Sequence, residues 1–289
     1  MKRHLFAAAA AAMLSASLFA ALPAQATSAF KTEVSGTGPA IILIPGLASS
    51  GEVWQGTAKH LCGPRQCHVL TLAGFAGQPA IEGELLPQVE RQLAEYIATN
   101  KLGKPVIIGH SLGGFVAMRF AAAHPDKIAK LVIVDSLPAM GAIQVPNVTA
   151  DQLKQMAAMT RDRMLTADDA TFTANQRRTV MTMATRPEDV DRIVGWGQRS
   201  DRKAVAGAMA ELIAEDLRDD VARIQAPTLV LGTWVAYREF APRDAIEQVY
   251  KAQYGKLPGV QVQIADSARH FIMYDDPAWM YDRIDRFLK

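Results

Sequence analysis

The sequence predicts an α/β fold, a mostly parallel and doubly wound sheet into which a block of helices is inserted. Short apolar runs rich in Ile, Val and Leu, typical of strands buried on both faces, recur along the chain. Helical patterns separate these runs, and this alternation favours a parallel sheet covered on both faces. From 139 to 218 no such run occurs, and charged, methionine-rich helical segments take its place.

The amino-terminal residues have the pattern of a secretory signal peptide. Met1-Lys2-Arg3 is basic, residues 5–22 are almost wholly apolar, and Ala24-Gln25-Ala26 has the small-x-small spacing of a cleavage site. We therefore expect cleavage after Ala26 and a periplasmic or secreted protein without a stable membrane anchor. The alternative is an uncleaved anchor, because the apolar stretch is only just long enough to span a bilayer.

The remaining elements are expected in chain order. We predict strands at 31–34, 40–44, 67–72, 105–109, 130–134, 226–231 and 260–264. Core helices are expected at 54–61, 85–99, 112–124, 242–254 and 278–288, and helices of the insertion at 151–165, 169–184, 187–195 and 203–217. The predicted organisation is a signal peptide at 1–26, a first part of the core at 27–138, a helical cap at 139–218 and a second part of the core at 219–289.

One stretch carries the strongest chemical signal. The predicted strand at 105–109 runs into Gly109-His110-Ser111-Leu112-Gly113-Gly114, and a helical pattern follows until Pro125. A serine on such a strand-to-helix turn has a strained backbone, so the residues two positions away on either side must lack bulk. The helix then points free N–H groups at whatever Ser111 attacks. The alternative is a chance Gly-x-Ser-x-Gly, which the flanking strand and helix disfavour.

This stretch resembles the nucleophile elbow of the α/β-hydrolase superfamily. The resemblance implies an α/β-hydrolase type of fold with a cap, and it makes Ser111 the nucleophile. In that family an oxyanion hole uses a backbone N–H after the nucleophile and another after the second strand. Leu112 and Leu47 occupy those positions, the latter in Pro45-Gly46-Leu47. The alternative is that Gly46 serves only a tight turn.

The resemblance also implies a base and an acid. Of the six histidines, His270 follows the last predicted strand, and Arg269-His270…Asp276-Pro277 resembles the family's catalytic-histidine loop. The family usually carries the acid after the penultimate strand, but residues 232–239 have no carboxylate at the expected position. Some members of the family carry the acid instead after the strand that follows the elbow helix, where Asp135 stands. The resemblance therefore makes Asp135 our preferred acid, and Glu239 and Asp266 remain alternatives. His110 is expected to point away from the attacking oxygen.

The two cysteines lie close together as Cys62 and Cys67, with Gly63-Pro64 as a turn between them. In an exported protein such a pair is expected to form a disulfide. A metal or redox site is the alternative, because His60 and His68 flank the pair, but a tight loop before a strand makes a poor cage.

These features predict a serine hydrolase that cleaves a carboxylic ester of a small or medium apolar substrate. The chemistry requires no metal and no organic cofactor. A near balance of 31 Lys and Arg against 29 Asp and Glu gives no sign of nucleic-acid binding, so the expected partner is a small-molecule acyl substrate. A cofactor-free perhydrolase or haloperoxidase-like enzyme and a non-catalytic binding module are the alternatives. Most cap methionines are expected to pack its helices together, and Trp196 is a candidate for facing the pocket.

Overall fold

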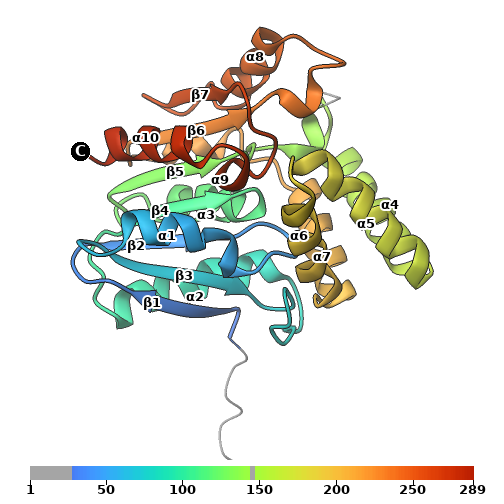
Figure 1. Ribbon diagram of the computed structural model, residues 1–289, viewed down its shortest axis with the longest axis horizontal. Coiled ribbons are helices and arrows are strands. Elements are labelled where there is room, and N and C mark those ends of the chain that lie inside the picture. The colour runs from blue at the N-terminus through green and yellow to red at the C-terminus, as the bar shows by residue number, and fades with distance from the viewer. Residues whose placement is uncertain (1–27, 144–146) are drawn as a thin grey trace, which may run out of the picture.

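The centre of the molecule is a seven-stranded sheet with the order β1-β3-β2-β4-β5-β6-β7 (Figure 1). The computed structural model describes residues 28–143 and 147–289, so the predicted signal peptide at 1–26 lies outside the described residues. β1 is antiparallel to β3, and the other pairs are parallel. The predicted, mostly parallel sheet is thus confirmed. Its strands are β1 (Phe30–Ser35), β2 (Ala40–Ile44), β3 (Gln66–Leu72), β4 (Val106–His110), β5 (Lys130–Val134), β6 (Thr228–Thr233) and β7 (Gln261–Ala265).

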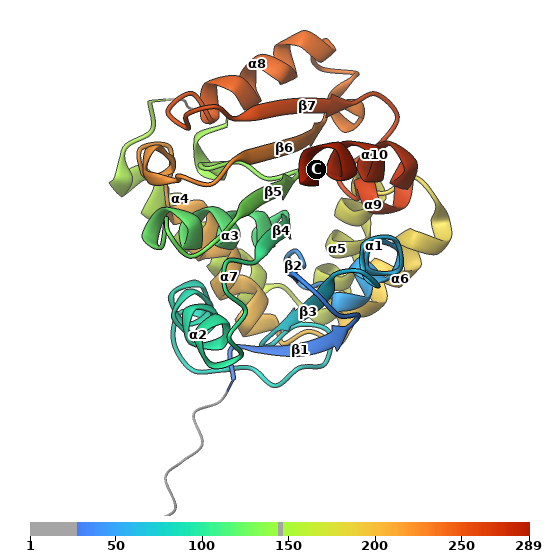
Figure 2. The same ribbon diagram turned by 90° about the vertical axis from the view of Figure 1, so that its left-hand side faces the viewer.

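Helices cover both faces of the sheet (Figure 2). One face packs against α2 (Leu85–Thr99), α3 (Leu112–Ala123) and α8 (Arg243–Gln253), and the other against α1 (Gln55–Leu61) and α10 (Pro277–Leu288). This double cover explains why the central strands are so apolar: every residue of β2 and of β6 is buried. Short helical turns complete the core as η1 (Gly51–Trp54), η2 (Met140–Ala142), η3 (Asp220–Arg223), η4 (Val235–Tyr237) and α9 (Ile272–Asp275).

The helices between β5 and β6 form a separate block at the edge where the parallel strands end (Figure 1). They are α4 (Ala150–Thr166), α5 (Asp169–Met183), α6 (Pro187–Gln198) and α7 (Arg202–Ala214). α4 packs on α7, and α5 packs on α6. Buried side chains of α7 join the core cluster on the α3 face, whereas those of α5 and α6 join the cluster on the α1 face. The block therefore bridges both halves of the core.

Some expectations for this block need correction. Trp196 does not face a pocket: it is 1% exposed, and its indole N–H donates to Glu52 of η1 at 3.2 Å, which ties α6 to the core. Met159 and Met181 are exceptions to the packing expected of most cap methionines, because they are 60% and 56% exposed. The helix predicted to reach residue 217 ends at Ala214. There the chain turns extended, and the N–H of Leu217 donates to the carbonyl oxygen of Pro138.

Cys62 and Cys67 form the expected disulfide, with their Cα atoms 5.7 Å apart. The flanking histidines are engaged elsewhere: His60 pairs with Asp285 at 2.8 Å, and His68 contacts the hydroxyl of Tyr96 at 2.7 Å. Across residues 28–143 and 147–289, no helix combines the length and apolarity needed to cross a bilayer.

Candidate active site

Ser111 occupies a strained turn between β4 and α3. Its φ of 52° and ψ of −121° fall where non-glycine residues are rarely found. The neighbouring glycines are required by space: a Cβ on Gly109 would lie 2.2 Å from the carbonyl oxygen of Gly113, and one on Gly113 would lie 2.3 Å from that of Ile44. The chain can therefore form this turn, with Ser111 at the sheet edge, only because Gly109 and Gly113 have no side chains.

His270 and Asp135 meet at the same edge. His270 lies in the loop after β7, Asp135 directly follows β5, and Nδ1 of the imidazole is 2.5 Å from a carboxylate oxygen of Asp135. A carboxylate partner requires the proton on Nδ1, so Nε2 is left free to accept one. In the described part of the chain no hydrogen bond joins Nε2 to the hydroxyl of Ser111, and such contacts often close only when substrate binds.

The carboxylate of Asp135 is held from its other side as well. It accepts hydrogen bonds from the backbone N–H of Thr233 at 3.1 Å, from the hydroxyl of Thr233 at 3.3 Å and from the phenol of Tyr250. Burial, and then the charge of Asp135, raises the pKa of Tyr250 well above its ordinary value, so the phenol stays a donor. These donors offset the cost of burying a carboxylate whose side chain is only 9% exposed.

The alternative acids lie elsewhere. The side chain of Glu239 is 77% exposed and pairs with Arg238 at 3.5 Å. Asp266 is 71% exposed and pairs with Arg243 at 2.6 Å. Neither carboxylate pairs with the imidazole of His270, so the structure pairs His270 with Asp135 at the sheet edge where Ser111 lies and leaves both alternatives on the surface.

His110, the last residue of β4, contacts the loop of His270, a contact that the sequence did not reveal. It is fully buried, its Nε2–H donates to the carbonyl oxygen of His270 at 3.0 Å, and the two imidazole rings are 4.5 Å apart. Burial, and then the proximity of His270, holds the pKa of His110 well below its ordinary value, which keeps this ring neutral. His110 therefore supports the backbone of His270 from the sheet.

Two backbone N–H groups lie beside the serine as candidates for an oxyanion hole. Leu112 begins α3, and the first N–H groups of a helix have no partner inside it. Leu47 follows Gly46. A Cβ added to Gly46 would lie 3.1 Å from the Cβ of Ser111. The close approach of Gly46 thus brings the chain that carries the N–H of Leu47 against the serine.

Tyr250 and Thr233 are parts of this site that sequence reasoning missed. Tyr250 lies inside an ordinary amphipathic pattern on α8, and Thr233 ends β6, so neither carries a motif. Pairing of β6 with β5 brings Thr233 beside Asp135, and packing of α8 on β6 brings Tyr250 there.

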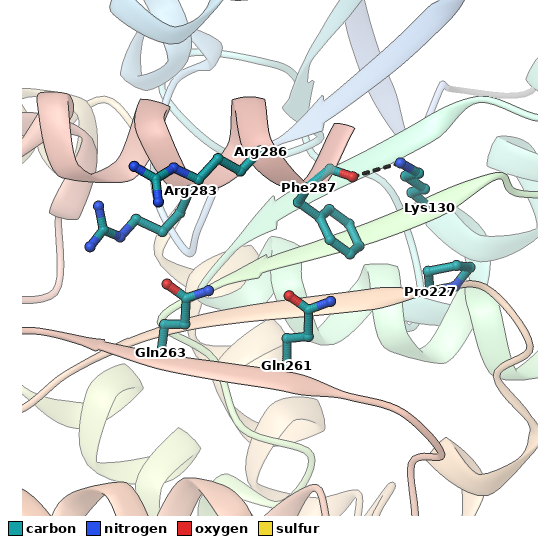
Figure 3. A pocket seen from close by; sticks show the side chains of 7 residues that line it. All are labelled: Lys130, Pro227, Gln261, Gln263, Arg283, Arg286 and Phe287. Carbon is teal, nitrogen blue, oxygen red and sulfur yellow. Dashed lines mark hydrogen bonds between the residues drawn. The ribbon is translucent and has the colours of Figure 1, made fainter. Parts of the chain in front are cut away.

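A pocket of about 450 Å³ lies at the opposite edge of the sheet (Figure 3). Lys130 begins β5 and Gln261 begins β7, and Arg283, Arg286 and Phe287 of α10 complete the wall. Because Asp135 and His270 follow the far ends of these parallel strands, this pocket is not part of the site around Ser111. Its cations already have partners, Asp282 for the arginines and the carbonyl oxygen of Phe287 for Lys130.

Comparison with known proteins gives consistent results. The model of the alpha/beta hydrolase family matches residues 41–283. A relative from Vibrio cholerae serotype O1, named pimeloyl-(acyl-carrier protein) methyl ester esterase, is 28% identical over 89% of this chain and 91% of its own. A protein of the same name from Aeromonas salmonicida is 30% identical over 67% of this chain and 76% of its own.

Solved structures agree on the fold. A thermophilic esterase from Thermogutta terrifontis superposes with a TM-score of 0.73 at 21% identity, over 90% of this chain and 92% of its own. An enol-lactonase from Burkholderia xenovorans LB400 superposes with a TM-score of 0.70 at 16% identity, over 90% and 96%.

Proposed function

This chain belongs to the alpha/beta hydrolase family, and from that premise we propose that Ser111, His270 and Asp135 hydrolyse a carboxylic ester through an acyl-enzyme. The enzyme is a carboxylic ester hydrolase. The observation that carries the assignment of residues is the 2.5 Å contact between His270 and Asp135 at the sheet edge from which Ser111 projects.

The reaction follows from this geometry. Nε2 of His270 takes the proton of the Ser111 hydroxyl while the oxygen attacks the ester carbonyl. Asp135 holds the imidazole in the tautomer that leaves Nε2 free and stabilises the imidazolium that forms. The imidazolium then protonates the leaving alcohol. In the second half, His270 activates a water molecule that releases the acid from Ser111.

The developing negative charge is held by the backbone N–H groups of Leu47 and Leu112. The amino terminus of α3 adds its partial positive charge at the same point. Loss of one oxyanion donor in such enzymes raises the barrier by about 2.7–4 kcal/mol, so these main-chain groups contribute as much as many side chains.

The substrate we propose is a short-alcohol ester, such as a methyl ester, of an apolar acid of medium length. Partly buried apolar side chains follow the ends of β2, β5 and β6, where an acyl chain would lie: Leu47, Leu137 and Trp234 pack against the core there. The relatives are named methyl ester esterases, which supports a small alcohol as leaving group. If the pattern at 1–26 directs export, as we propose, the enzyme meets free esters in the periplasm or outside the cell.

A fluorophosphonate and an ester panel test this proposal. Wild-type protein is expected to be labelled and to cleave methyl and p-nitrophenyl esters with a preference among acyl lengths, and Ser111→Ala is expected to lose both activities. Ser35→Ala, on the exposed end of β1, is the matched control and should behave as wild type. Folded wild-type protein that neither reacts with the fluorophosphonate nor cleaves any ester would contradict the proposal.

A further inference from the structure

The loop that carries His270 is bound to the helical insertion as well as to the sheet. The N–H of Phe271 donates to the carbonyl oxygen of Met183 at 3.1 Å, where α5 ends. The guanidinium of Arg269 donates to the carbonyl oxygen of Met181 at 2.7 Å. Both neighbours of His270 in the chain therefore hydrogen-bond to the last turn of α5. These carbonyl groups are ones that a helix end leaves without internal partners.

Asp275 joins the same segments through its side chain. One carboxylate oxygen accepts from the N–H of Thr185 at 3.0 Å, and the other accepts from the hydroxyl of Thr185 at 2.9 Å. The second oxygen also accepts from the N–H of Arg269 at 2.9 Å. A single carboxylate thus links the backbone next to His270 to the segment that follows α5.

Apolar packing continues across this junction. Phe271 is 4% exposed and belongs to the same buried cluster as Ala184 and Val180 at the end of α5. The ring of Tyr274 stacks on Phe271, and the guanidinium of Arg192 from α6 lies 5.5 Å from the centre of the Tyr274 ring. A shift of α5 relative to the sheet would therefore move the loop at 269–275.

We propose that Asp275 is a positioning residue through which the insertion holds His270 within reach of Ser111. The inference rests on the proposed function, and it makes the end of α5 part of the catalytic support as well as a cover. His110 holds the carbonyl group of His270 from the sheet, and Asp275 of α9 holds the N–H of Arg269 while Thr185 of the insertion donates to the same carboxylate. A misplacement of about 1 Å can cost about 100-fold in rate, so this attachment matters for turnover more than for substrate binding.

Asp275→Asn tests the proposal, because the amide keeps the size of the side chain but replaces one of the two acceptor oxygens with a donor, so the three hydrogen bonds from Thr185 and Arg269 cannot all persist. We expect kcat to fall about tenfold and KM to stay within about twofold, since the loop moves and the apolar surroundings of the substrate do not. Asp168→Ala is the matched control. Asp168 caps the other end of α5 through the N–H of Thr171 at 2.8 Å, so its loss weakens the same helix without touching the loop.

Thr185 supplies a second, milder pair of variants. Thr185→Val keeps the shape and the backbone N–H but removes the hydroxyl donor, and kcat is expected to fall about threefold, as suits one hydrogen bond at the surface. Thr185→Ser restores the donor and should restore kcat. If Asp275→Asn fails to fold, this pair alone decides the question: equal kcat in the two variants would overturn the proposal.

Hydrogen exchange separates this inference from the proposed function. A peptide spanning 266–274 contains the N–H groups of Arg269 and Phe271, and it should exchange faster in Asp275→Asn than in wild type or Asp168→Ala whether or not an ester is cleaved. Unchanged exchange, or a kcat in Asp168→Ala as low as in Asp275→Asn, would overturn the inference. Wild-type protein without esterase activity would instead contradict the proposed function.

Discussion

The ends of β5 and β6 are neighbours in the sheet, yet they treat an acidic side chain in opposite ways. The two strands pair in register from Leu131 with Thr228 to Val134 with Leu231. After β5, Asp135 is 9% exposed and accepts hydrogen bonds from other elements. After β6, Glu239 is 77% exposed and pairs only with its neighbour Arg238 among the described residues. The difference teaches that a carboxylate can be buried where hydrogen-bond donors surround it, whatever its position along the chain.

The end of β6 supplies the donors instead of the acid. Thr233 is the last residue of β6, and Tyr250 reaches Asp135 from α8, which packs on that strand. The ring of Tyr250 lies against Gly232: a Cβ there would be 2.6 Å from its ζ carbon. Because Gly232 has no side chain, Tyr250 can cross β6 and donate to the carboxylate after β5.

Replacing each of the two acids by its amide is the prediction with the largest expected effect. In Asp135→Asn the amide cannot hold the imidazole in the right tautomer, and kcat should fall about 10⁴-fold, as in serine proteases with the same change. Glu239→Gln should keep kcat within about twofold, because its side chain is solvated. Steady-state hydrolysis of the best ester measures both. A large loss in Glu239→Gln with little in Asp135→Asn would exchange their roles.

Gly232→Ala disrupts the close packing of the Tyr250 ring on Gly232, which allows the phenol to reach Asp135. The added methyl group meets the buried ring of Tyr250, and overpacking of this kind costs about 1–3 kcal/mol of unfolding free energy. We expect urea denaturation to show that loss, together with a lower kcat as the phenol moves from Asp135. Gly207→Ala on α7 is the control: nothing lies within 4 Å of its Cβ position, so it should be neutral or stabilising. A fully stable Gly232→Ala would show that the ring moves freely.

The same two strand ends show what sequence reasoning can reach. Ser111 and His270 stand in recognisable local patterns, and the apolar runs located each strand to within about two residues, because burial on both faces dictates composition. Asp135 could be ranked above Glu239 only weakly, since its donors come from β6 and α8, about a hundred residues away. The role of His110 was missed for the same reason. Such contacts depend on tertiary placement, which a local pattern does not encode.

Tyr250→Phe removes one hydrogen-bond donor to Asp135 and so measures how much that donor contributes. A hydrogen bond to a charged group contributes about 1.5–3 kcal/mol, and with Thr233 still present we expect kcat to fall about tenfold. Tyr254→Phe is the matched control, because this second buried tyrosine of the same region donates to the carbonyl oxygen of Ser136 instead. Equal kcat values in the two variants would contradict a special role for Tyr250.

Alkaline pH should weaken the surroundings of Asp135 and leave those of Glu239 unaffected. Burial and then Asp135 raise the pKa values of Tyr250 and Tyr254 well above 10 in the folded protein. Above pH 10 the unfolded chain therefore binds fewer protons than the folded one, and stability falls with rising pH until the folded pKa is passed. Each phenol contributes at most about 1.4 kcal/mol per pH unit to that slope, so between pH 10 and about pH 10.5 the further loss per tyrosine stays below about 0.7 kcal/mol.

Unfolding free energies between pH 9 and pH 11 measure this last effect. Tyr250→Phe should show a shallower fall of stability above pH 10 than wild type, because a phenylalanine has no proton to lose in the unfolded chain. Glu239→Gln should follow the wild-type curve, since the side chain of Glu239 is largely exposed to solvent. If Tyr250→Phe and wild type lose stability at the same rate, the phenol of Tyr250 ionises as easily in the folded protein as in water. It would then not be the buried donor that keeps Asp135 in place.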